Sequence, residues 1–411
     1  MYSTLLAVIY VAFVSLGLPD ALVGAGWPVM HAELGVPVAF AGIITMVIAG
    51  STIVASLASE RLTRRFGAGP VTAVSVGLTA CALVGFSVSG SFWLLVLWAI
   101  PYGLGAGAVD AALNNYVALH YAARHMNWLH SFWGVGAAIS PFIMSYAITS
   151  GLGWDGAYRT VGVIQAVITV GLIVSLPLWR KVHAVAPVAA AGESVAEDDD
   201  GEQSRTGHVP LATALRIPGV VLILVAFFAY CGLEGTSILW ASTYLVTDRG
   251  VDAATAAAFA SLFLLGITGG RFLAGFFADS LGDVALIRGG FAALGLGVVL
   301  IALPLETDVI ALAGLVVAGL GCAPIYPAII HSTPVNFGRR NSQAIIGIQM
   351  AAAYTGSTLA PPLFGLISTW IGAWTFPYFL GILVVLGLVM SERLNGLVRR
   401  RGGAGELNAS I

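Results

Sequence analysis

Long apolar stretches, each about the length needed to cross a lipid bilayer, alternate with short polar segments along almost the whole chain. A transmembrane helix needs about 20 mostly apolar residues, and twelve such stretches can be placed in the 411 residues. They are 4–30, 37–59, 70–90, 92–119, 127–150, 159–179, 216–246, 254–278, 284–303, 308–332, 342–369 and 374–394. The pattern predicts an all-α membrane protein with twelve transmembrane helices.

One polar segment, 180–215, is much longer than the others and divides the chain in the middle. It is rich in small residues and carries six acids, which are Glu193, Glu197, Asp198, Asp199, Asp200 and Glu202. Such a composition is typical of a solvated linker. We therefore expect a six-helix bundle over 1–179, an acidic linker over 180–215, a second six-helix bundle over 216–396 and a tail over 397–411.

The composition supports a membrane protein and argues against a soluble protein. The chain is 58% hydrophobic and 9% charged, whereas soluble proteins have about 25% charged residues. The net charge of −2 and the scattered basic residues give no reason to expect nucleic-acid binding. The cysteines lie in apolar stretches without metal-ligand spacing, and no nucleophile–base set or phosphate-binding loop is present. We expect no metal, no cofactor and no enzymatic activity.

The basic residues predict the orientation in the membrane, because short cytoplasmic loops are enriched in Lys and Arg. If the N-terminus is cytoplasmic, 15 of the 18 basic residues fall on the cytoplasmic side. They are Arg61, Arg64, Arg65, Arg124, Arg180, Lys181, Arg205, Arg216, Arg288, Arg339, Arg340, Arg393, Arg399, Arg400 and Arg401. We expect a monomer in the cell (inner) membrane with both termini in the cytoplasm.

Two short matches relate the halves of the chain. The first pairs Arg271, Gly275, Asp279 and Gly282 with Ser56, Glu60, Arg64 and Gly67, at the same spacing of four, four and three. The second pairs the segment 136–141 with 356–361, each running from a glycine to a proline. Together they indicate two six-helix repeats, the plan of transporters that work by alternating access.

At this point the chain resembles the major facilitator superfamily over nearly its whole length. The segment from Gly275 through Asp279 to Gly282 is similar to that superfamily's Gly-x-x-x-Asp-x-x-Gly signature between paired helices. The resemblance implies a conformational latch formed by these three residues. We expect Arg271 to be a gate or latch partner inside the membrane, with a role in binding the substrate as the alternative. The first-half copy has Arg64 in the place of the acid, so a symmetric latch is not implied.

Within the superfamily, the chain is most similar to the fucose–proton symporter family. A Gly-rich run in 103–109 is followed by Asp110 and, one turn on, by Asn114, where that family has an acid and an Asn. Asp20 matches an Asp that acts in proton coupling in the family. The opening of the fifth stretch is also similar, with His130 and Trp133 in the place of the family's polar amides.

Three isolated acids carry the functional prediction. Asp20, Asp110 and Glu234 lie in apolar stretches with no charged residue within ten positions. A charge at bilayer depth costs about 2.5–3.5 kcal/mol on insertion scales, so it usually faces a cavity and marks a substrate or ion path. An apolar surrounding favours the protonated acid and water favours the charged one, so changing access moves a proton. The alternative for each acid is a structural hydrogen bond to a neighbouring helix.

A sugar offers hydroxyls and an apolar ring face, so its site needs acids, amides and an aromatic platform. The candidate substrate-binding residues are Asp110, Asn114, His130, Trp133, Glu234, Gln349, Trp27, Trp240, Tyr326 and Tyr354. Asp110 has a second interpretation, a direct pair with His130. Each aromatic residue also has a second interpretation, which is helix packing or a position in the membrane interface.

The leading hypothesis is a secondary active transporter that carries a small hydrophilic solute together with protons by alternating access. A monosaccharide is the first candidate for that solute. The first alternative is a proton-antiport exporter of drugs or metabolites, which would use the same acids around a broader, more apolar pocket. A non-transporting sensor on the same scaffold is disfavoured, because the linker and the ends of the chain carry no recognisable signalling domain.

Overall fold

The computed structural model of the chain is built from helices, and it describes residues 2–37, 40–189, 209–305 and 308–409. The helices of the first half are α1 (Tyr2–Gly17), α2 (Leu22–Glu33), α3 (Ala41–Phe66), α4 (Ala68–Ser87), α5 (Phe92–His120), α6 (Ala123–Thr149) and α7 (Gly153–Ala189). The second half has α8 (Leu211–Arg216), α9 (Val220–Thr247), α10 (Ala253–Leu281), α11 (Asp283–Ala302), α12 (Asp308–Cys322), α13 (Ile325–Phe337), α14 (Arg339–Trp370), the 3-10 turn η3 (Ala373–Thr375) and α15 (Phe376–Ala409). The acidic run of the predicted linker lies outside the described residues.

Each of the twelve predicted stretches corresponds to one helix or to a pair of helices in line. Within the described part of the chain, eleven spans are long and apolar enough to cross a membrane. The twelfth, α14, is long enough but more polar, and it packs against α3 and α5 of the other half. The predicted all-α membrane fold is thus confirmed. Several boundaries differ. The largest differences are at the ends of α3, α7 and α15, which continue past the predicted ends of their spans at 59, 179 and 394. Hydropathy marks the apolar layer and not the end of the helical backbone.

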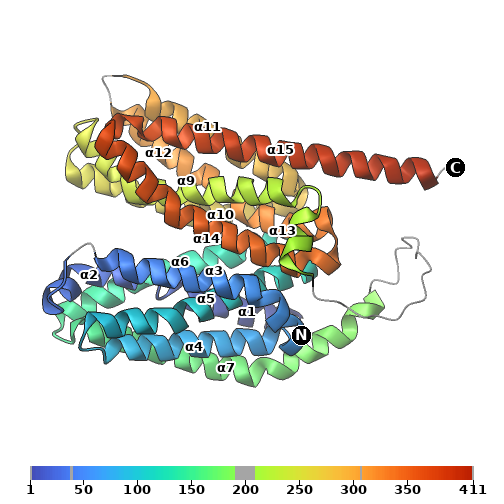
Figure 1. Cartoon of the computed structure of the whole chain (residues 1–411), viewed down its shortest axis with the longest axis horizontal. Coiled ribbons are helices and arrows are strands. Elements are labelled where there is room, and N and C mark those ends of the chain that lie inside the picture. The colour runs from blue at the N-terminus through green and yellow to red at the C-terminus, as the bar shows by residue number, and fades with distance from the viewer. Residues whose placement is uncertain (1, 38–39, 190–208, 306–307, 410–411) are drawn as a thin grey trace.

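The helices form two bundles that lie side by side (Figure 1). The first bundle contains α1 to α7, drawn in blue to green, and the second contains α9 to α15, drawn in yellow-green to red. The bundles meet where α3 packs against α14 and α6 packs against α10. Any solute path between the bundles is therefore lined by residues from both halves of the chain.

The first span is interrupted between α1 and α2, at Pro19. Pro19 has no backbone N–H, so the carbonyl of Ser15 loses its helical partner. Gln165 of α7 donates its Nε2 hydrogen to that carbonyl at 2.5 Å. The neighbouring helix thus satisfies the freed carbonyl, which makes the interruption between α1 and α2 tolerable at membrane depth.

The second sequence match between the halves has a structural counterpart in helix packing. A Cβ on Gly136 of α6 would lie 2.2 Å from the backbone oxygen of Val14 in α1. A Cβ on Gly356 of α14 would lie 2.3 Å from the backbone oxygen of Phe228 in α9. Each glycine lets two helices approach until their backbones touch, at equivalent places in the two bundles.

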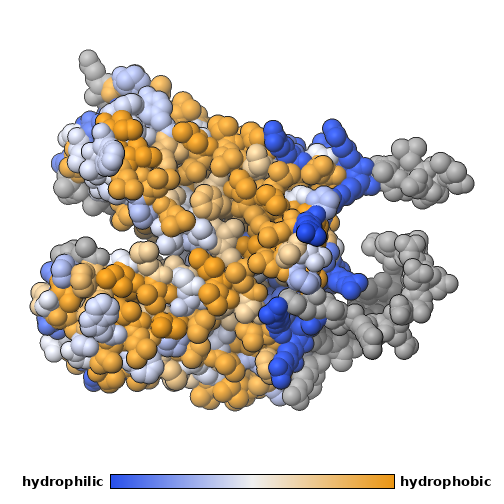
Figure 2. All heavy atoms as spheres, viewed as in Figure 1, coloured by the Kyte–Doolittle hydropathy of each residue, from blue (hydrophilic) through white to orange (hydrophobic). Residues whose placement is uncertain are grey.

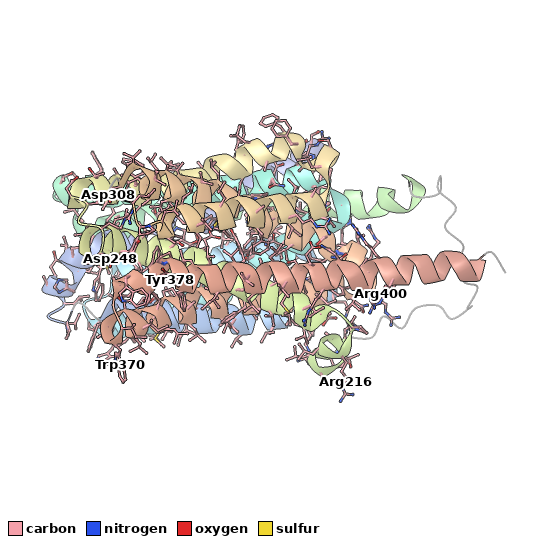
Figure 3. The ribbon with its side chains drawn as sticks, turned by 90° about the horizontal axis from the view of Figure 1, so that it is seen from above. Arg216, Asp248, Asp308, Trp370, Tyr378 and Arg400 are labelled. Carbon is pink, nitrogen blue, oxygen red and sulfur yellow. The ribbon has the colours of Figure 1, made fainter. Side chains whose placement is uncertain are left out.

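Most basic side chains gather at one end of the molecule, which we call the basic end. In Figure 2, strongly hydrophilic side chains, drawn in dark blue, gather at this end, and a largely apolar surface lies beside them. In Figure 3, Arg216 and Arg400 lie toward this end, and Asp248 and Asp308 lie at the opposite end. The apolar band between the two ends is what a membrane-spanning protein presents to lipid.

Candidate functional site

A cavity of about 250 Å³ lies between the two bundles, and both bundles line it. Its polar and aromatic lining consists of Asp20, Asp110, His130, Trp133, Glu234, Arg271, Tyr326 and Tyr354. The apolar part includes Phe13, Leu16, Ile238 and Ala353. The three isolated acids therefore line one cavity, although Asp20 and Glu234 are more than 200 positions apart in the sequence.

Asp20 lies in the break between α1 and α2 and is exposed to the space between the bundles. Its Oδ1 accepts a hydrogen bond from the Tyr102 hydroxyl at 2.7 Å, and its Oδ2 accepts one from the Trp133 Nε1 hydrogen at 2.8 Å. Both donors come from the first bundle, from α5 and α6. The carboxylate is thus held from two sides while its surface stays accessible.

Asp110 is buried and belongs to a chain of hydrogen bonds that crosses from one bundle to the other. Tyr354 of α14 donates to its Oδ2 at 2.8 Å, and the Asn114 amide donates to its Oδ1 at 2.7 Å. His130 Nε2 lies 3.0 Å from the Asn114 oxygen, so it must carry a hydrogen to bond there. The predicted contact between Asp110 and His130 is therefore not direct, because Asn114 stands between them.

The two acids of the first bundle have partners of the same two kinds. Each accepts from one group that can only donate, the indole of Trp133 for Asp20 and the amide of Asn114 for Asp110. Each also meets one tyrosine hydroxyl, which can donate or accept. When either acid takes up a proton, that proton can sit on the oxygen that faces the tyrosine, and the hydrogen bond reverses instead of breaking. Both sites can therefore hold an acid in either protonation state.

Glu234 of α9 pairs with Arg271 of α10 on the second-bundle side of the cavity. The Arg271 Nη2 lies 3.4 Å from Glu234 Oε1 and 3.4 Å from the Tyr230 hydroxyl. Arg271 is 3% exposed, and its guanidinium also lies over the rings of Trp133 and Tyr326, at 6.0 and 5.8 Å. The structure thus places Arg271 at the cavity, with Glu234, and not beside Asp279.

The remaining predicted binding residues separate into those that reach the cavity and those that do not. Tyr326 reaches it, and its ring packs edge-on against His130 at 4.6 Å. Trp27 packs inside the first bundle against Phe92. Trp240 donates to the Pro361 carbonyl at 2.9 Å and packs on Phe364, and Gln349 accepts from Thr333 at 3.0 Å. Trp27, Trp240 and Gln349 therefore pack between helices and do not line the cavity.

Sequence reasoning missed several residues of the site. Tyr102, which donates to Asp20, lies in α5 eight residues before Asp110, and no feature of the sequence marked it. Tyr230 contacts Arg271, and Cys231 also lines the cavity. Tyrosines are common in membrane helices for packing and interface reasons, so their presence alone does not mark a site.

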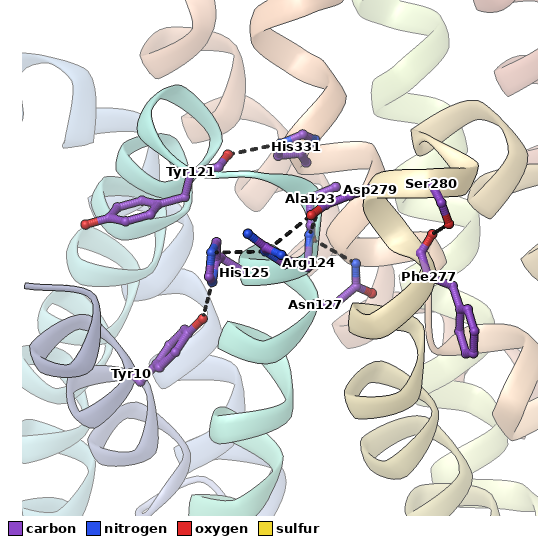
Figure 4. Close-up of polar contacts among 10 residues, drawn as sticks. All are labelled: Tyr10, Tyr121, Ala123, Arg124, His125, Asn127, Phe277, Asp279, Ser280 and His331. Atoms are coloured by element: carbon purple, nitrogen blue, oxygen red, sulfur yellow. Dashed lines mark hydrogen bonds and ion pairs between the residues drawn. The ribbon is translucent and has the colours of Figure 1, made fainter. Parts of the chain in front are cut away.

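At the basic end, the predicted latch residue Asp279 joins the two bundles. Its carboxylate accepts from the backbone N–H of Arg124 at 3.1 Å and pairs with the Arg124 Nε at 3.2 Å (Figure 4). Asp279 therefore caps the first turn of α6 from the opposite bundle. Gly275 lies one turn earlier, where a Cβ would be 2.3 Å from the Trp128 indole of α6. The signature thus allows α6 and α10 to approach closely at this end.

A second set of contacts closes the same end. His331 of α13 meets the Asp283 carboxylate through Nδ1 at 2.8 Å and the Tyr121 carbonyl through Nε2 at 3.2 Å (Figure 4 shows the latter). Both partners are acceptors, so the ring donates through both nitrogens in this geometry. Arg339 of α14 also donates to the Leu119 carbonyl at 3.0 Å.

The cavity is therefore closed toward the basic end, and it is approached from the opposite end. The surface between the two lobes is hollowed on that opposite side (Figure 2). Asp20, whose residue surface is exposed, lies on the approach. A closed end and an open end around one central cavity are what alternating access requires of each of its two states.

Comparison with known proteins agrees with this geometry. A family model described as Major Facilitator Superfamily matches residues 9–337 and 222–401. Bypass of stop codon protein 6 of Saccharomyces cerevisiae is 24% identical over 281 residues, which are 66% of this chain and 56% of the yeast protein. The chain thus spans little more than half the length of that relative. An uncharacterized MFS-type transporter of Yersinia pestis is 21% identical over 350 residues, 83% of each chain.

Three solved structures have the same fold. FucP, the E. coli fucose:proton symporter, in its outward conformation matches with a TM-score of 0.72 and 14% identity, over 95% of this chain and 98% of FucP. The proton:xylose symporter XylE, bound to 6-bromo-6-deoxy-D-glucose, matches with 0.74 and 12%, over 96% and 95%. The human organic anion transporter MFSD10 matches with 0.69 and 13%, over 95% and 98%. At these identities the likeness is one of fold.

Proposed function

This chain belongs to the Major Facilitator Superfamily, whose model matches most of its length, and we propose that it is a proton-coupled symporter of a small hydrophilic solute. A monosaccharide is the first candidate for that solute. In this proposal the basic end faces the cytoplasm of the cell (inner) membrane, in keeping with the distribution of Lys and Arg. The structure then corresponds to the outward-facing state. Sugar:proton symporters of the same fold, FucP and XylE, support this choice.

The observation that carries the proposal is the pair of acids Asp20 and Asp110, each bonded to one fixed donor and one reversible tyrosine hydroxyl. Such an environment accepts a proton without losing a hydrogen bond. Asp20 is the exposed member, so it takes the role of the acid that binds and releases the coupled proton. Asp110 and Glu234 bind the solute or share the protonation.

The cavity fits a small polar solute better than a drug. Its volume of about 250 Å³ lies below the ~300–1,000 Å³ of drug-sized sites. Its aromatic walls, Trp133 and Tyr326, suit the apolar face of a sugar ring. The acids, the Arg271 guanidinium and the tyrosine hydroxyls suit its hydroxyl groups. A drug exporter is expected to have a broader and more apolar pocket.

The test combines a binding screen with one variant. A thermal-shift screen against monosaccharides, polyols and drugs identifies the solute class, since a ligand that binds the folded protein raises its melting temperature. The bound solute is then followed in proteoliposomes with wild type and Asp20→Asn. The Asn side chain can still accept from Trp133 but cannot take up a proton. We expect proton-driven accumulation to be lost and solute counterflow to persist.

Accumulation by Asp20→Asn at the wild-type level would show that the coupling acid is elsewhere. A screen in which only large apolar drugs raise the melting temperature would favour the exporter.

A further inference from the structure

A second chamber, which we call the side chamber, lies beside the solute cavity, and most of its lining comes from the first bundle. Its volume is about 340 Å³, and it is lined by the broken first span, α3, α4, α5 and α7, together with α14 of the second bundle. Asp20, Tyr354 and Ser357 line both spaces. The α3 residues in its wall, such as Thr45 and Ala49, come from the early part of that helix, away from the basic end. Thr45 is exposed. The chamber therefore extends from Asp20 toward the open end of the molecule.

Asp20 stands between the two spaces, and its two oxygens serve different sides. Oδ1 accepts from Tyr102, which lines the side chamber and not the solute cavity. Oδ2 accepts from Trp133, which lines the solute cavity and not the side chamber. The carboxylate thus has one oxygen toward the solute cavity and the other toward the side chamber.

The side chamber is lined by hydroxyls that can bind water. Tyr158 of α7 is 1% exposed, and its hydroxyl is buried without a hydrogen-bond partner although the residue lines the chamber. Thr45 and Thr52 each use their hydrogen on a carbonyl of their own helix, which leaves their oxygens free to accept. A cavity holds water when it is roomy and offers two to four polar partners. This chamber meets both conditions.

We propose that the side chamber is a water-filled proton entry to Asp20 that is separate from the solute path. This inference rests on the proposed function, because it concerns the route of the coupled proton. The proton arrives on a water molecule that donates to the Tyr102 oxygen. Tyr102 passes its own hydroxyl proton to Asp20 Oδ1 and keeps the incoming one, so the tyrosine ends neutral and the carboxylate becomes a carboxylic acid. The proton then enters without crossing a bound solute.

The titratable and charged groups that share one of the two spaces with Asp20 are Asp110, Tyr102, Tyr158, Tyr354, His130, Cys231, Glu234, Arg271 and Tyr326. Only Tyr102 and Tyr158 belong to the side chamber alone. A change that acts on these two, or that fills the space around them, therefore separates the two routes.

The test measures how fast Asp20 takes up a proton in purified protein, with no solute present. Trp133 bonds to Asp20, so its fluorescence reports the protonation of that acid after a flash-released proton jump. Asp20→Asn should abolish this fluorescence change, which shows that the change arises from protonation of Asp20. Ala49→Leu fills the side chamber, and Ala353→Leu, its matched control, fills the solute cavity instead. Tyr102→Phe removes only the hydroxyl that passes the proton.

We expect Ala49→Leu and Tyr102→Phe to slow protonation by about tenfold or more, which is ~1.4 kcal/mol in the barrier. Ala353→Leu should leave the rate near that of wild type. Slowing by Ala353→Leu with normal rates in the other two would overturn the proposal, because the proton would then enter through the solute cavity. Normal rates in all three variants would also overturn it. Because the experiment uses no solute, either result can be distinguished from a failure of the proposed transport function.

Discussion

At the residue scale, the site depends on how a few charges are satisfied in an apolar environment. Glu234 and Arg271 neutralise each other inside the second bundle, with side chains that are 15% and 3% exposed. Removing one partner of a buried ion pair leaves the other charge without compensation, at a cost of about 3–5 kcal/mol. The pair is therefore important for folding as well as for the cavity.

We predict that Glu234→Gln lowers the free energy of unfolding by up to ~3–5 kcal/mol, because Arg271 stays charged and buried. Chemical denaturation in detergent measures the change. Glu392→Gln is the matched control, because Glu392 pairs with Arg288 where both side chains are about 40% exposed, and such exposed pairs contribute about 0–1 kcal/mol. The double variant Glu234→Gln, Arg271→Gln should recover much of the loss. Fully additive losses would show that the two residues are not coupled.

The sequence identifies the acids of the site but not their partners. A lone charge in an apolar stretch is conspicuous, so Asp20, Asp110 and Glu234 could be selected directly. Tyr102 could not, since a tyrosine in a membrane helix has common structural explanations. The bridge that Asn114 makes depends on side-chain reach between two helices, which spacing along one helix does not give.

At the scale of helices, close packing through glycine decides where the spans meet. Gly136 brings α6 against α1 next to the break that carries Asp20, and Gly356 does the same for α14 and α9. Hydropathy was enough to predict the twelve spans. The interruption between α12 and α13 was not predicted, because Pro324 lies in an apolar stretch that reads as continuous.

Gly136→Ala is expected to destabilise the protein, since its Cβ would lie 2.2 Å from the backbone oxygen of Val14 and neither helix can move without disturbing Asp20. Melting temperature in detergent is the measurement. Gly171→Ala in α7 is the control, because nothing lies within 4 Å of a Cβ there, and Ala in place of a helical Gly gains about 0.5–1 kcal/mol. Equal melting temperatures for the two variants would mean that α1 and α6 are less tightly packed than described.

At the scale of the whole molecule, the two bundles are held together at the basic end and apart at the other. Contacts of modest strength do this, among them the Arg124–Asp279 pair and the His331 bond to Tyr121. The free-energy difference between two such states is small. No pattern in one sequence reveals which end is closed, because the same residues must also permit the opposite state.

Asp279→Ala should shift the population toward opening at the basic end. It removes an exposed ion pair worth about 0–1 kcal/mol and a capping bond worth about 0.5–2 kcal/mol. Spin labels on the two bundles at that end, read by electron-electron distance measurement, report the shift. Asp155→Ala removes an ion pair of the same 3.2 Å separation inside α7 alone, so it should leave the distances unchanged. Identical distance distributions for the two variants would rule out a latch at Asp279.

Symport of a small solute with a proton is the central claim, and the direction of proton movement tests it most directly. Proteoliposomes containing the wild-type protein are placed in weakly buffered medium without a proton gradient, and the solute selected by the thermal-shift screen is added outside. We predict that the external medium becomes more alkaline, since protons enter together with the solute, and that Asp20→Asn abolishes the change. Acidification on adding the solute would contradict the account, because it would mean that protons leave as the solute enters.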